Sequence, residues 1–139
     1  MFAKLFSRKP STGSSDSTAR QAMAALMVRI AKSDDDYAVA ECERIDAVLS
    51  VLYDLSEADA TSLRLQAEAL EADAPDTVRF TRAIKNAVPY DDRFDVVRAL
   101  WQVVLADGER DHEEDALMRL LASLLGVNDR DSAIARQQA

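Results

Sequence analysis

The chain has 139 residues, of which 48% are hydrophobic, with only three glycines and three prolines, and this is enough apolar material for the core of one domain. Its 25 acidic and 17 basic side chains give a formal net charge of −8, which repels nucleic acid over most of the surface, so we expect no DNA or RNA partner. Aromatic residues make up 6% and β-branched runs are missing, so the composition predicts an all-α fold.

The single cysteine and the single histidine restrict the chemistry. Cys42 excludes an intramolecular disulfide and a thiolate zinc site. It shares an apolar helical stripe with Ile45, Leu49 and Leu52, which favours a buried, inert thiol. His112 follows an acid at a predicted helix start, where it is either a solvated residue or a metal ligand. No stretch reaches the roughly 18 apolar residues of a membrane span, and no secretory signal is evident, so we expect a cytoplasmic protein.

The sequence predicts a flexible, basic and Ser-rich tail over residues 1–18, ahead of a helical domain over residues 19–136. Apolar Phe2, Leu5 and Phe6 lie among basic residues in the first part of this tail. The basic residues are Lys4, Arg8 and Lys9. Two interpretations stay open: a tail without a role, or an amphipathic stub that binds an anionic membrane surface or a partner weakly, because it is short.

Apolar residues at helical spacing predict a first helix over residues 19–30 and a second over residues 42–52. Ser56 followed by Asp59 has the pattern of a capping box, with the serine as N-cap and the aspartate at the third helical position. This pair predicts a third helix that continues to about Ala72.

Residues 73–76 have the pattern of a helix N-terminus, with a proline in the first turn, and predict the start of a fourth helix. This helix is expected to end at Pro89. A fifth helix begins near Asp91 and ends at residues 107–108. It carries the densest apolar stripe of the chain, so we expect it to be the central helix of the fold. The stripe consists of Phe94, Val97, Leu100, Trp101, Val104 and Leu105.

A sixth helix is predicted to begin at Asp111, with Glu114 three residues further on, and to end at Gly126. Asn128 with Asp131 then caps a short last helix. The chain is therefore expected to form one all-α bundle of about seven helices.

The pattern of helix, acidic turn and helix occurs twice. The first turn runs from Asp34 to Glu41 and the second from Asp107 to Glu114, and each acid lies 73 positions from its counterpart. Three pairs of flanking apolar residues keep the same offset: Ile30 with Val103, Ile45 with Met118, and Val48 with Leu121. This arrangement predicts an internal pseudo-repeat.

Two interpretations of the acidic turns remain open. Asp34 and Asp107 follow helix C-termini, where the macrodipole disfavours a carboxylate by a few tenths to about 1 kcal/mol, so something must compensate. Either the two aspartates cap the next helices, whose first turns favour the negative charge of Glu41 and Glu114, or the four carboxylates converge on a divalent cation of the Ca²⁺ or Mg²⁺ class. The second turn is not an EF-hand, because its sixth position is His112 instead of glycine.

With these features the chain resembles the TerB-like tellurite-resistance family of bacterial helical domains. The resemblance covers roughly residues 19–135 and rests on both acidic turns, in order, with the segments 79–80, 89–93 and 100–108. It implies a bundle of about seven helices with internal pseudo-twofold symmetry, in which the two turns come close together. It also implies a role in resistance to tellurite and other chemical stress, and it suggests a divalent-metal site formed by Asp34, Glu41, Asp107 and Glu114.

We therefore expect a non-enzymatic stress-response or scaffold domain that presents an acidic face to a protein partner. One alternative is a carboxylate-based hydrolase with these acids as general acid and base. The sequence offers it no nucleophile with a base, no phosphate-binding glycine loop and no histidine cluster. Another alternative is a membrane-associated adaptor that docks through the basic N-terminal stub.

Overall fold

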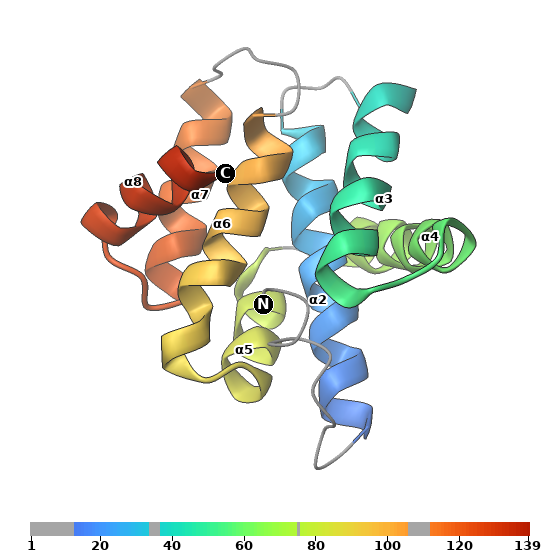
Figure 1. Cartoon of the computed structure of the whole chain (residues 1–139), viewed down its shortest axis with the longest axis horizontal. Coiled ribbons are helices and arrows are strands. Elements are labelled where there is room, and N and C mark those ends of the chain that lie inside the picture. Colours follow the sequence, from blue (N-terminus) through green and yellow to red (C-terminus); the bar gives the residue numbers. More distant parts are fainter. Residues whose placement is uncertain (1–12, 34–36, 75, 106–111) are drawn as a thin grey trace.

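The computed structural model describes residues 13–33, 37–74, 76–105 and 112–139, and of residues 13–16 and 112–114 it describes the backbone alone. In these stretches the chain forms helices and no strand, which confirms the all-α fold (Figure 1). The helices are α2 (Gly13–Lys32), α3 (Val39–Tyr53), α4 (Glu57–Asp73), α5 (Val78–Ala87), α6 (Arg93–Val104), α7 (His112–Leu124) and α8 (Asp129–Gln138), with a 3₁₀ turn, η1 (Tyr90–Asp92), before α6.

Two helices begin at the capping residues that the sequence predicted. At the start of α4 the Ser56 hydroxyl accepts a hydrogen bond from the backbone N–H of Asp59 at 3.1 Å. At the start of α8 the Asn128 side chain accepts one from the backbone N–H of Asp131 at 2.8 Å. Each bond satisfies a backbone donor that has no partner within the helix, which is why the chain turns into a helix at that point.

Two helices end in the left-handed conformation that closes a Schellman motif. After α7, Gly126 has a φ of 81°, and the N–H of Val127 reaches back to the carbonyl of Ala122 at 2.8 Å. After α3, Asp54 has a φ of 55° and is the one described non-glycine residue with a positive φ. Both ends point the chain into a short turn, so α4 and α8 begin within a few residues of the preceding helix.

The first helix is longer than the sequence predicted. α2 begins at Gly13, inside the segment assigned to the tail over residues 1–18. No proline or glycine interrupts residues 14–18, so a helix that is held in the core from Ala19 onward can extend back toward the N-terminus. The rest of the predicted tail, residues 1–12, lies outside the described residues.

The helix α2 lies at the centre of the bundle, where it contacts α3, α4, α5, α6 and α7. Residues 22–28 of this helix are buried in succession, each at most 3% exposed, so neighbours cover it on all sides. The prediction of the fifth helix, α6, as the central one is therefore wrong, although α6 is itself largely buried. The prediction failed because three alanines in this stretch of α2 add little to an apolar stripe while letting neighbouring helices approach closely.

The six apolar residues of the pseudo-repeat all lie in the core. Each is at most 8% exposed: Ile30, Ile45, Val48, Val103, Met118 and Leu121. The offset of 73 residues thus pairs core positions of α2 and α3 with core positions of α6 and α7.

Candidate functional site

The helix ends that flank the two acidic turns lie at the same end of the molecule. α2 and α6 end there, and α3 and α7 begin there, at the top of Figure 1. A hydrogen bond joins the two neighbourhoods, since the exposed Arg44 of α3 donates through Nε to the carbonyl of Gln102 in the last turn of α6 at 3.4 Å. The fold therefore brings together the helices on either side of both turns.

The four predicted ligands are placed to different extents. Glu41 is half-buried in the first turn of α3, and it is the third residue of that helix. Glu114 is likewise the third residue of α7, where the backbone alone is described. Asp34 and Asp107 lie outside the described residues. The two glutamates thus occupy equivalent positions in the first turns of their helices, where a negative charge is favoured.

In the described part of the chain, no group of three or more histidine, cysteine, aspartate or glutamate side chains is arranged to hold a metal ion. Cys42 is half-buried beside Tyr37, so the predicted burial of its thiol is only partial. The side chain of His112 is outside the description.

An ion-pair network around the buried Glu71 fastens the end of α4 to α2. Glu71 is 7% exposed, and its carboxylate accepts hydrogen bonds from Nε of Arg29 and from Nζ of Lys32, both at 2.8 Å. Arg29 also donates through Nη2 to the carbonyl of Ala74 at 2.8 Å, which satisfies a backbone acceptor just beyond the end of α4. The cluster compensates the buried charge of Glu71 and fixes the direction in which the chain leaves α4.

A second network anchors the chain next to the first acidic turn. The guanidinium of Arg64 in α4 donates to Asp46 of α3 and to Glu68, each at 2.6 Å. Asp46 also accepts the hydroxyl of Thr61 at 2.9 Å, and Glu68 accepts the hydroxyl of Tyr37 at 2.7 Å. Because Tyr37 lies within the first acidic turn, two residues before α3 begins, this bond holds that part of the turn against α4.

The surroundings of Tyr37 predict a loss of stability at alkaline pH. Burial, and then the hydrogen bond to the Glu68 carboxylate, raise the pKa of the Tyr37 phenol far above its usual value. A raised folded-state pKa gives stability that is complete below the unfolded-state pKa of about 10 and is lost as the pH rises above that value. We expect Tyr37→Phe to lower the free energy of unfolding by about 1 to 2 kcal/mol near pH 8, and by less near pH 11.

Urea unfolding of the wild type and of Tyr37→Phe at both pH values measures this effect. Tyr90→Phe is the matched control, because Tyr90 is 62% exposed and its substitution should change little at either pH. A difference between wild type and Tyr37→Phe that stays the same at both pH values would contradict the assigned role of the phenol.

In the described part of the chain, every helix is too short or too polar to cross a lipid bilayer.

Comparison with known proteins gives one match. The family model of TerB, described as tellurite resistance protein TerB, matches residues 20–137, a range that includes both acidic turns and the described helices except residues 13–19 of α2 and residue 138 of α8. No curated protein and no solved structure matches the chain.

Proposed function

The chain belongs to the TerB tellurite-resistance family, and on this premise we propose that it is a non-enzymatic stress-response domain whose two acidic turns bind one divalent cation. The ligands in this proposal are Asp34, Glu41, Asp107 and Glu114. The observation that carries it is the gathering, at one end of the bundle, of the four helix ends that flank the two turns (Figure 1). The equivalent positions of the two glutamates, each the third residue of its helix, support it further.

Carboxylate oxygens are the ligands that hard cations such as Ca²⁺ and Mg²⁺ prefer. Four carboxylates gathered in one place repel one another, and each aspartate also follows the negative end of a helix macrodipole. A bound dication relieves both penalties. Because it would join the turn between α2 and α3 to the turn between α6 and α7, it would also fix how the two helix pairs are held together.

This coupling gives the domain a means of signalling without catalysis. Binding of the cation would change the shape and charge of one end of the bundle, and a protein partner would recognise the changed surface. This chain has a net charge of −8, so a partner with a basic surface fits it best. The sequence shows no serine or cysteine nucleophile paired with a base, which supports a binding role over hydrolysis.

Helix capping is the competing explanation of the two aspartates, and one pair of substitutions separates it from cation binding. Asparagine caps a helix about as well as aspartate but brings no negative charge. We expect Asp34→Asn combined with Asp107→Asn to keep or slightly raise the metal-free stability, because it removes both penalties, and to abolish the stabilisation by Ca²⁺ or Mg²⁺. For the wild type, this stabilisation is about 2.7 kcal/mol when the metal is at 100 times its Kd.

Thermal unfolding with and without metal is the measurement. The control is Asp73→Asn combined with Asp91→Asn, which removes the same charge from two exposed acids outside the turns. If metal raises the melting temperature of the variant with Asp34→Asn and Asp107→Asn as much as that of the wild type, Asp34 and Asp107 are not ligands.

A further inference from the structure

A groove with an apolar floor and an acidic rim runs between α3 and α4 on the outer side of the molecule. It has a volume of about 1010 Å³, and its apolar part includes Ala47 and Val51 of α3 and Ala58 and Leu65 of α4. Val51 is 69% exposed and Leu65 is 53% exposed, so two large apolar side chains of the groove face solvent. Two such residues in one groove mark a surface that favours an apolar ligand.

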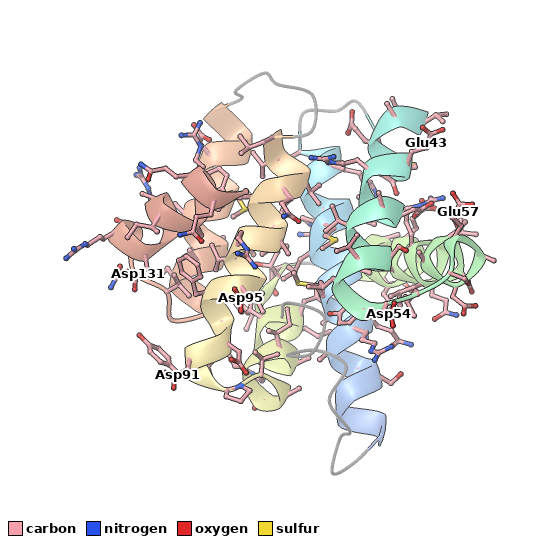
Figure 2. The ribbon with its side chains drawn as sticks, viewed as in Figure 1. Glu43, Asp54, Glu57, Asp91, Asp95 and Asp131 are labelled. Atoms are coloured by element: carbon pink, nitrogen blue, oxygen red, sulfur yellow. The ribbon has the colours of Figure 1, made fainter. Side chains whose placement is uncertain are left out.

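The rim of the groove selects for positive charge. Three acids line it and no lysine or arginine does so among the described residues. Asp46 is already paired with Arg64, so the uncompensated part of the rim charge comes from Glu43 and Glu57, which are exposed. Figure 2 shows these two glutamates on the same side of the molecule, one on α3 and one at the start of α4.

We propose that residues 2–9 of this chain occupy the groove between α3 and α4. The segment has three apolar side chains at helical spacing, Phe2, Leu5 and Phe6, which match the apolar floor. It also has three basic side chains, Lys4, Arg8 and Lys9, which match the acidic rim. The proposal is independent of the cation site.

The point of attachment lies close to the groove. The first described residue of the chain is Gly13, at the start of α2, and Ser17 lies one turn further on. Ser17 lines a second, smaller hollow between α2 and α4 together with Ser62, and Ser62 also lines the groove. Only the width of α4, about 10 Å, therefore has to be crossed. Residues 10–12 connect the segment to Gly13 and span up to roughly 14 Å when extended, which is more than this width.

Methyl chemical shifts of the full-length chain test the contact directly. We expect Phe2→Ser, Leu5→Ser and Phe6→Ser, combined in one variant, to shift the methyl resonances of Val51 and Leu65. The resonances of Val78 and Leu120, which are exposed outside the groove at 40% and 49%, should stay unchanged. No shift at Val51 and Leu65 would overturn the proposal.

The rate of tryptic cleavage after Lys4 and Arg8 tests the role of the rim. We expect Glu43→Lys with Glu57→Lys to raise this rate about tenfold, because two surface ion pairs are replaced by repulsion. Val51→Ser, at an exposed position that the fold does not need, should raise the rate as well. The control is Asp73→Lys with Asp91→Lys, which changes the net charge equally at exposed sites outside the groove. Equal cleavage rates in the groove variants and in this control would overturn the proposal.

Vesicles of phosphatidylserine and phosphatidylcholine separate the groove from a membrane as the target of the segment. If the groove holds the segment, the variant with Glu43→Lys and Glu57→Lys releases it. This variant then binds vesicles more strongly than the control variant with Asp73→Lys and Asp91→Lys. If wild type and both variants bind the vesicles equally, and deletion of residues 2–9 abolishes the binding in all three, the segment is a membrane anchor and the groove proposal fails.

Discussion

Glu71→Ala is expected to lower the free energy of unfolding by about 3 kcal/mol. The Glu71 side chain is buried and receives two charged donors, so its removal leaves both cations without their acceptor. The Lys32 side chain is 43% exposed and can return to water. The Arg29 side chain is only 23% exposed, and after the substitution it retains only backbone carbonyl acceptors, so most of the loss arises there.

Urea unfolding near neutral pH measures this loss. Asp73→Ala is the matched control, because Asp73 is exposed and lies two residues further along the same last turn of α4. Glu71→Gln keeps the size of the side chain and removes its charge, so it should fall between the wild type and Glu71→Ala. Equal stability of Glu71→Ala and Asp73→Ala would show that the network contributes nothing to the fold.

Leu26→Ala is expected to destabilise the protein by about 2 to 5 kcal/mol. Leu26 is fully buried in the middle of α2, the helix that contacts five others. The loss combines the transfer of the removed methyl groups with the cavity that remains, and neighbours held by several helices cannot collapse into that cavity.

The matched control is Leu120→Ala in α7, where the same chemical change occurs at a side chain that is 49% exposed. It should change the stability by less than about 1 kcal/mol. Similar effects of the two substitutions would contradict the central position of α2 in the core.

The features that the sequence predicted correctly are those determined by neighbouring residues. The caps at Ser56 and Asn128 and the helix end at Gly126 each depend on a few consecutive residues, so a local pattern is sufficient to find them. The pairing of Arg64 with Glu68 also has the spacing of helix neighbours, and this signal could have been used.

The networks that hold the helices together depend on residues far apart in the chain. Arg29 and Glu71 are 42 positions apart, and nothing in the local sequence marks them as partners. The same holds for the indole of Trp101, which donates to the hydroxyl of Ser132 in α8 at 3.1 Å across 31 positions. Such pairs follow from the packing of α2, α4, α6 and α8, which no single segment specifies.

The candidate site shows the same division. The positions of Glu41 and Glu114 in the first turns of their helices were predicted, although the N-cap of α3 is Ala38, whose side chain makes no capping hydrogen bond. That the flanking helices meet at one end of the bundle followed only from the family resemblance, because it depends on how the two helix pairs pack. The convergence of the four carboxylates on a cation stays a prediction.

The melting temperature of the metal-free protein, measured after separate additions of Ca²⁺, Mg²⁺, Mn²⁺ and Zn²⁺, tests the proposed cation site most directly. A ligand that binds only the folded state raises its stability by RT ln(1 + [L]/Kd). We predict a clear increase with at least one of the hard cations, Ca²⁺ or Mg²⁺, and a smaller response to Zn²⁺, which prefers nitrogen and sulfur ligands. An unchanged melting temperature at millimolar concentrations of all four metals would contradict the cation site and leave the acids of the two turns as helix caps.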